Sequence, residues 1–404
     1  MADKQRKIEL LAPAGNWERF VTAIQFGADA VYLGTTAFSL RNLADNFTLE
    51  QVAEAVRYAH ERSVKVYVTV NAFMRDEDLE NLPETIAALD AAGADALIIN
   101  DPSVIQIAKR VAPNLPLHLS TQANTLNSEA ALFWHEQGIE RIVLARELTL
   151  SQIAQMRRKL PETLELEAFV HGAMCVSYSG RCLFSNYIDG RDSNRGACAQ
   201  PCRYQYALME EKRPGEYFPV FEDEKGTYIM NSRDMCMIDH LDDLMAAGVD
   251  CLKIEGRAKS AYYAAIVTGA YRHAIDAALA GQPLDPVWRD EVEHISHRHY
   301  ATGFFYGQPG QYYESARYLR DWQICAVVTA CDEGGLATLS LRNKFAAGDI
   351  VEIVGPDTKP FTITVPMMRD GEGNELAQPK TPQMVFTMQL PQPVPPYSML
   401  RRAV

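Results

Sequence analysis

Four cysteines in the middle of the chain are the residues best suited to chemistry. Cys175, Cys182, Cys198 and Cys202 follow the spacing C-x6-C-x15-C-x3-C. Thiolates are soft ligands that bind iron–sulfur clusters and zinc. The spacing lacks the paired C-x2-C unit that is typical of a structural zinc site. We therefore predict an iron–sulfur cluster that carries redox chemistry, with zinc as the alternative.

Other potential metal ligands are expected to be structural. Three cysteines lie in strand-like runs, where a thiol behaves as a small apolar side chain. Three histidines lie in HISHRHY near a predicted helix end, and no carboxylate spacing supports a metal site there. These residues are Cys251, Cys325, Cys331, His294, His297 and His299.

Composition and charge limit the class of protein. The chain has 404 residues, 47% of them hydrophobic and 23% charged, which is typical of a globular protein with two domains. It has no apolar run long enough to span a membrane and no signal-peptide pattern, so we expect a cytoplasmic protein with reduced thiols. The net charge of −13 argues against broad nucleic-acid binding. An RNA partner would need a local basic patch, which we expect near residues 181–203 and 253–259.

A short pattern recurs along the first three quarters of the chain. A glycine ends a helical stretch, a turn follows, and then comes an apolar run. Gly27, Gly93, Gly138 and Gly248 hold the glycine position, where a left-handed conformation favours glycine. Nearly continuous apolar runs are typical of buried parallel strands. Such runs predict eight strands: Glu9–Ala12, Ala30–Gly34, Lys65–Asn71, Ala96–Asn100, Leu117–Thr121, Arg141–Ala145, Leu166–Val170 and Cys251–Glu255.

Strands that alternate with helices predict an α/β fold, a (β/α)8 TIM-like barrel over residues 1–300. A doubly wound open sheet is the alternative, but no G-x-G-x-x-G turn follows the first strand. Between the seventh and eighth strands lies an insertion of about 80 residues, at about 172–250, that contains the four cysteines. Because loops that follow barrel strands form the catalytic face, we expect the cysteines at the barrel mouth.

The pattern changes over residues 301–404. Alternating runs such as WQICAVVTACDE, LATLSLRN and DIVEIVGP are separated by Gly, Pro and Asp. This alternation is typical of antiparallel strands, and we predict a small C-terminal β-barrel domain. The proline-rich stretch QLPQPVPPY is expected to be an extended closing segment.

The segment ELEAFVHGAMCVSYSGRCLFS resembles the signature of the collagenase-like, unassigned-type peptidase family. Phe184 stands where that signature usually has an aliphatic residue. The resemblance extends along the chain, and residues 221–263 and the β-rich tail are similar to the branch that hydroxylates transfer RNA. The matching signature residues are Glu167, Phe169, Gly172, Ala173, Met174, Cys175, Gly180, Cys182 and Ser185.

The resemblance implies 5-hydroxylation of the wobble uridine of certain tRNAs, with prephenate and without molecular oxygen. It also implies an iron–sulfur cluster, which we expect to be 4Fe-4S. The implied partners are the tRNA anticodon loop, a small dicarboxylate and the iron–sulfur assembly machinery. The implied cluster ligands are Cys175, Cys182, Cys198 and Cys202, with Cys236 as an alternative fourth ligand.

Polar residues near the strand ends are the candidates for catalysis and substrate contact. Tyr178 could stack on a flipped-out base or cover the cluster. Arginines suit a dicarboxylate because a guanidinium binds a carboxylate through two hydrogen bonds; an ion-pair network at the mouth is the alternative. The catalytic candidates are Tyr178, His171, Lys253 and Glu255, and the substrate-binding candidates are Arg41, Gln122, Asn124, Arg146 and Arg257.

Three alternative functions stay open at this point. A collagenase-like peptidase would need a nucleophile with a base, a carboxylate pair or a catalytic metal. The sequence has neither a G-x-S-x-G nor an H-E-x-x-H motif. A hydroxylase of ribosomal RNA or of a quinone precursor is the second alternative, and a zinc-stabilised RNA-binding protein is the third.

Overall fold

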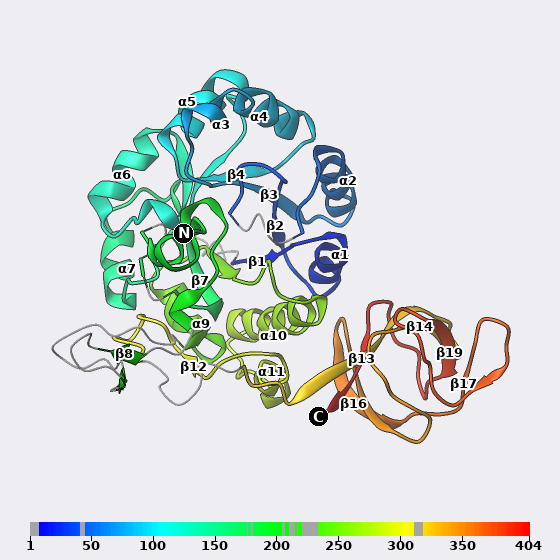
Figure 1. Ribbon diagram of the computed structural model, residues 1–404. Coiled ribbons are helices and arrows are strands. Elements are labelled where there is room, and N and C mark those ends of the chain that lie inside the picture. The colour runs from blue at the N-terminus through cyan, green and yellow to red at the C-terminus, as the bar shows by residue number, and fades with distance from the viewer. Residues whose placement is uncertain are drawn as a thin grey trace. The chain divides into compact units, whose positions relative to one another are not determined.

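The computed structural model describes residues 8–40, 45–175, 177–178, 181–203, 207–209, 215, 217–219, 233–310 and 318–404. Of the candidate residues, Arg41 lies outside this set. The chain forms two compact units (Figure 1). The first contains residues 1–20, 29–259 and 298–318, and the second contains residues 21–28, 260–297 and 319–404. Each unit is described separately below.

Eight parallel strands close a barrel in the first unit, as the sequence predicts. Neighbouring strands pair in chain order, and β7 pairs with β11 while β11 pairs with β1, which closes the ring. Apolar residues such as Leu11, Ala30 and Ile98 pack together in a buried cluster. The strands are β1 (Glu9–Pro13), β2 (Ala30–Gly34), β3 (Lys65–Val70), β4 (Ala96–Ile99), β5 (Leu117–Leu119), β6 (Ile139–Val143), β7 (Glu165–Ala173) and β11 (Cys251–Ile254).

Helices connect these strands, and several begin at side-chain caps. Thr48 and Thr149 each form a capping box with a glutamine three residues later. The four predicted glycines have φ values between 82° and 93°, which confirms their left-handed conformation. The helices that precede β11 include α1 (Trp17–Gln25), α2 (Leu49–His60), α3 (Asp76–Leu79), α4 (Leu82–Ala91), α5 (Pro102–Val111), α6 (Ser128–Glu136), α7 (Leu150–Arg157) and α9 (Leu241–Ala246). Helices α10 (Ala261–Leu279) and α11 (Pro286–Glu291) follow β11 and belong to the second unit. None of the helices in the described part of the chain could cross a lipid bilayer.

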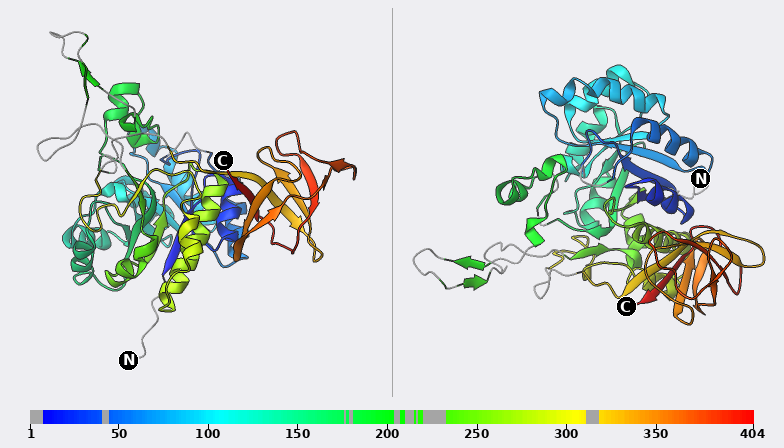
Figure 2. Two further views of the ribbon diagram at one scale, coloured as in Figure 1. Left: turned by 90° about the horizontal axis from the view of Figure 1, so that it is seen from below. Right: turned by 45° about the vertical axis from the view of Figure 1, so that its right-hand side comes forward.

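The insertion between β7 and β11 has structure of its own. It contains α8 (Phe184–Asp189), the paired strands β8 (Ala207–Met209) and β9 (Tyr217–Pro219), and β10 (Asp234–Cys236). Figure 2 shows this green part of the chain outside the barrel wall. Strand β10 pairs antiparallel with the end of β7. The sequence did not reveal this pairing, which extends the sheet beyond the barrel.

The C-terminal part of the second unit is an eight-stranded antiparallel sheet, so the predicted antiparallel architecture is confirmed. The strand order is β16-β15-β20-β13-β14-β19-β17-β18. Its buried core includes Cys325, Leu339 and Phe386, and Cys331 packs against that core while half-buried. The strands are β13 (Trp322–Cys331), β14 (Leu336–Leu341), β15 (Ile350–Gly355), β16 (Thr358–Thr364), β17 (Met368–Arg369), β18 (Glu375–Leu376), β19 (Val385–Gln389) and β20 (Met399–Ala403).

Strand β20 was missed in the sequence analysis. It follows the proline-rich stretch and lies between β13 and β15 in the middle of the sheet. It also carries Arg401, whose side chain is wholly buried. The Arg401 guanidinium donates to both carboxylate oxygens of Glu291 at 2.5 and 2.6 Å and to Glu352 at 2.5 Å.

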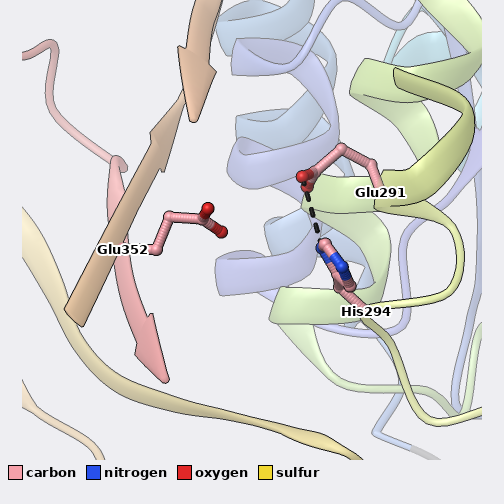
Figure 3. A group of neighbouring side chains, drawn as sticks. All are labelled: Glu291, His294 and Glu352. Atoms are coloured by element: carbon pink, nitrogen blue, oxygen red, sulfur yellow. Dashed lines mark ion pairs between the residues drawn. The ribbon is translucent and has the colours of Figure 1, made fainter. Parts of the chain in front are cut away.

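Glu291 and Glu352 also belong to the group of three side chains that is shown in Figure 3. Glu291, His294 and Glu352 offer three ligand atoms within 4.8 Å of one another. His294 Nδ1 lies 3.5 Å from Glu291. Because Arg401 already bridges the two carboxylates, the group is an ion-pair network of the C-terminal unit.

The Arg401 network predicts acid-sensitive stability. Burial by itself would raise the pKa of Glu291, but His294 and Arg401 outweigh it and lower the pKa. The stabilisation is therefore present above the unfolded pKa of about 4.3 and is lost as the pH falls through the lower folded pKa. Glu291→Gln should cost about 3–5 kcal/mol at neutral pH, because it leaves Arg401 undercompensated.

Urea unfolding between pH 3 and pH 7 tests this prediction. The free energy of unfolding of Glu291→Gln should depend less on pH in the acid range than that of the wild type. Asp276→Asn is the control, since Asp276 forms an exposed pair with Arg272 and should contribute less than about 1 kcal/mol. Equal losses for the two variants would contradict the prediction.

Candidate functional site

A cavity of about 200 Å³ lies at the mouth of the barrel. Its wall combines residues at the ends of the barrel strands with residues of the insertion. The sequence analysis placed the cysteines at this mouth, and all four line the cavity. The predicted residues that line it are Cys175, Cys182, Cys198, Cys202, Tyr178, Gln122, Arg146, Lys253, Glu255 and Arg257.

The cysteine segment is arranged to present its thiols. Cys175 is exposed and the other three are half-buried, and none of the four forms a disulfide. Ser193 Oγ and Asn194 Nδ2 donate to the carbonyl of Cys182 at 2.7 and 3.0 Å. The Gln200 N–H donates to Cys198 Sγ at 3.4 Å. Hydrogen bonds of this kind tune the reduction potential of iron–sulfur clusters.

The cysteine sulfurs do not form a closed tetrahedral site in the described parts of the chain. A tetrahedral zinc holds each thiolate at about 2.3 Å, so its sulfurs lie about 3.8 Å apart. Within the described parts of the chain, no three cysteine sulfurs lie within 4.8 Å of one another. Four thiols around one cavity form a donor set whose chemistry suits an iron–sulfur cluster or zinc.

An ion pair ties the cysteine segment to the barrel. Arg195 donates to Asp78 at 2.7 and 3.1 Å and to the carbonyl of Phe73 at 2.8 Å. The hydrogen bond from Arg195 lowers the pKa of Asp78. Arg75 makes a looser contact with the same segment, 3.9 Å from Asp192. The Arg195 contacts hold the insertion against the loop that follows β3.

Lys253 is fixed by a buried ion pair. Its Nζ lies 2.7 Å from Glu167, and the two side chains are 5% and 0% exposed. Glu167 also lies 3.4 Å from Arg141, which binds Glu9 at 2.6 Å. The Lys253 ammonium lies 4.6 Å from the ring centre of Tyr32. Lys253 is thus a rigid cation in the cavity wall.

Arg146 has the properties of an anion-binding residue. Its guanidinium stacks on Phe169 at 4.0 Å and donates to the carbonyl of Ala173 at 3.0 Å. Its buried Nε has no hydrogen-bond partner. Burial raises the pKa of the neighbouring Glu147, and the charge of Arg146 partly offsets this rise. Arg146 therefore keeps an unpaired donor at the cavity while it interacts with one neighbouring carboxylate.

Arg257 is held by two hydroxyl groups whose role as its partners could not be predicted from the sequence. Its Nη1 donates to Ser39 Oγ and Thr69 Oγ1, each at 2.8 Å, and the residue is 5% exposed. A Cβ on Gly34 would lie 2.1 Å from Nη1, so only glycine leaves room for this guanidinium. No local pattern in the sequence indicates that Gly34 and Arg257 meet, because they lie far apart along the chain.

A row of polar side chains continues the wall across β3 and β5. Asn71 donates to Ser120 Oγ at 3.4 Å, and Ser120 Oγ donates to Gln122 at 3.1 Å. Only Gln122 of this row was predicted. Asn71 and Ser120 directly follow strand residues, so their positions after β3 and β5 were the available signal.

Three candidates do not line the cavity. An extra residue, Val170, opposes β11 where the register shifts, and this bulge interrupts the alternation of β7. His171 is 1% exposed and its ring lies 5.4 Å from that of Tyr300. Cys236 pairs with His171 in the sheet. Asn124 accepts a hydrogen bond from Arg181 at 2.9 Å and so supports the insertion from outside the cavity.

Comparison with known protein families identifies the family of this chain. The sequence profile described as Peptidase family U32 matches residues 15–315, and that of the Peptidase family U32 C-terminal domain matches residues 320–401. The chain belongs to peptidase family U32. The resemblance seen in the cysteine segment is therefore confirmed, and within the U32 family the similarity can be followed further.

Two relatives match almost the whole chain. The tRNA hydroxylation protein P1 of Bacillus subtilis is 39% identical over 98% of this chain and 95% of its own length. The tRNA hydroxylation protein P of Escherichia coli is 37% identical over 96% and 94%. The 23S rRNA 5-hydroxycytidine C2501 synthase of Escherichia coli is 38% identical over 69% of this chain and 41% of its own length. These matches confirm the resemblance to the tRNA hydroxylation branch.

The Arg195 contacts generate a prediction about the insertion. Arg195→Ala should increase amide hydrogen exchange in residues 182–199 by about threefold to tenfold, because a charge-assisted anchor is lost. Exchange in the barrel strands should not change. Arg75→Ala is the matched control and should leave both regions as in the wild type. An Arg195→Ala protein with wild-type exchange in the insertion would contradict this role.

Proposed function

We propose that this protein is an RNA hydroxylase that converts the wobble uridine of tRNA to 5-hydroxyuridine. The observation that carries the proposal is the cavity, where four cysteines lie with Arg146, Arg257 and Lys253. The names of its U32 relatives, two tRNA hydroxylation proteins and an rRNA hydroxycytidine synthase, support the reaction class. Replacement of C5–H by C5–OH is a two-electron oxidation of the base, so without molecular oxygen the reaction needs another donor of the oxygen atom and another acceptor of the two electrons.

The polar row of the cavity suits a nucleobase. An enzyme that modifies C5 must take the base out of its stack and bind its edge. Asn71, Ser120 and Gln122 offer both donors and acceptors for that edge. Tyr178 lines the cavity and is 49% exposed, so it can stack on the entering base at the rim.

The cationic groups suit a small dicarboxylate, which we propose to be prephenate. Arg146 keeps a buried Nε without a partner, and its fork can bind a carboxylate through two hydrogen bonds. Arg257 and Lys253 are two further cations of the wall. Held by neighbouring residues, these groups lose little freedom when they bind an anion.

Cys175, Cys182, Cys198 and Cys202 would hold the iron–sulfur cluster, and Cys236 lies outside the cavity wall. A cluster held by these thiols would supply electron transfer at the cavity. Among the surrounding residues, Gln200 donates its N–H to Cys198 Sγ, and Arg195 holds the insertion that carries the thiols. We propose that the reaction does not use molecular oxygen.

The peptidase name of the family has less support from the cavity. A cysteine nucleophile needs a base within hydrogen-bond reach. No histidine is found among the described residues that line the cavity, and Glu255 is the one carboxylate there. The hydroxylase proposal uses the thiols, cations and polar row together, whereas a peptidase would leave most of them without a role.

The decisive experiment is mass spectrometry of nucleosides from total tRNA. A deletion strain should lack 5-hydroxyuridine derivatives, the wild-type gene should restore them, and Cys175→Ala should not. Cys331→Ala is the control, because that thiol lies in the C-terminal sheet. The purified wild type should contain iron and acid-labile sulfide. Unchanged nucleosides after deletion, with no parallel pathway present, would refute the proposal.

Arg146 gives a separate prediction about the cosubstrate. Arg146→Ala should raise the KM for prephenate about tenfold to 100-fold, because a charge-assisted contact is removed. Arg146→Lys should recover only part of the loss, since an ammonium cannot form the two parallel bonds. Arg110→Ala, a change of an exposed arginine on α5, should leave the KM unchanged. An unchanged KM in Arg146→Ala would exclude Arg146 from the carboxylate site.

A further inference from the structure

The outer face of α8 carries exposed apolar side chains. Leu183, Tyr187 and Ile188 are 53%, 82% and 50% exposed. Leu183, the N-cap of α8, and Tyr187 are four residues apart, so they lie on one face of the helix, and Ile188 lies about 100° round the helix from Tyr187. Large exposed apolar groups that gather in one place usually mark an interaction site.

The inner face of the same helix belongs to the cavity. Phe184 and Ser185 line it, and Ser185 is wholly buried. Ser185 Oγ accepts the N–H of Ala199 at 3.0 Å, which fixes the helix to the cysteine segment. Helix α8 therefore separates the cavity from solvent. Both views of Figure 2 show this green helix outside the barrel.

Two exposed arginines flank the apolar face. Arg181 precedes α8 and donates through Nε to Asn124 at 2.9 Å. Arg191 follows α8, where its N–H donates to the Ser185 carbonyl at 3.2 Å. Asp189 is exposed nearby, and Asp192 is half-buried. An exposed apolar ridge with one aromatic ring, Tyr187, and an arginine on either side along the chain fits a polyanion that carries apolar rings.

We propose that Leu183, Tyr187, Ile188, Arg181 and Arg191 form a stacking platform for unpaired bases of a single-stranded RNA loop. This inference rests on the proposed function, because the base next to the target would reach the platform when the target enters the cavity. Aromatic side chains stack on bases of any sequence, and arginines bind the phosphates between them. The platform thus selects an open loop over a duplex.

A protein partner is the less suitable occupant. A stable protein interface buries about 800 Å² on each partner, whereas this ridge consists of three apolar side chains. A protein interface also does not require arginines at both ends of the ridge or an adjoining cavity. A single-stranded RNA loop would contact the apolar side chains, the two arginines and the adjoining cavity together.

Binding of a labelled anticodon stem-loop RNA to the full-length protein tests the platform. Tyr187→Ala should weaken binding about fivefold to 100-fold, as the loss of one base–aromatic stack does. Tyr187→Phe should restore it, because the ring remains. Phe133→Ala is the matched control, since Phe133 is 53% exposed on α6. A duplex RNA should bind equally to the wild type and to Tyr187→Ala.

The outcomes separate the platform from the proposed function. If Tyr187→Ala binds the loop as the wild type does while tRNA is still hydroxylated, the platform is refuted and the function stands. If Tyr187→Ala loses loop binding while the wild type hydroxylates no RNA, the platform stands and the function fails. If Tyr187→Ala only abolishes self-association, the face belongs to a second copy of the chain and the inference is overturned.

Discussion

The ion pairs of Glu167 are the interaction on which the barrel and the cavity both depend. This carboxylate is wholly buried on β7, and it would be very costly without Lys253 at 2.7 Å and Arg141 at 3.4 Å. Those two cations come from β11 and β6, so the contacts join three adjacent strands, including the seam that closes the barrel. The same ion pair therefore helps to close the barrel and holds the Lys253 ammonium at the cavity.

Parallel closure also explains why residues far apart in the sequence meet. All eight strands end at the same mouth, so the residues that follow them share one cavity. The insertion after β7 must start there, and Arg195 then holds its cysteines against the loop after β3. Strand β7 runs beyond the barrel and pairs with β10. The thiols consequently have a fixed position relative to Arg146 and Lys253, which any shared chemistry requires.

The local electrostatics of the cavity differ from those of the whole chain. The net charge is −13, yet the described residues of the wall include Arg146, Arg257 and Lys253 and a single carboxylate, Glu255. A net charge describes solubility and long-range steering, whereas binding follows the groups within a few ångströms. An acidic protein can therefore still carry a local group of cations, as this cavity does.

The sequence by itself determined the eight strands, their order and the position of the cysteines at the mouth, because periodicity and glycine caps are local signals. It also identified the lining residues Gln122, Arg146, Lys253 and Arg257 through their places after strands. Only the tertiary structure decided that His171 leaves the cavity, because a bulge opposite β11 breaks the alternation of β7. It alone showed that Gly34 makes room for Arg257 and that β20 enters the centre of a sheet. Those outcomes depend on partners distant along the chain, and no local pattern encodes which strand or side chain will meet another.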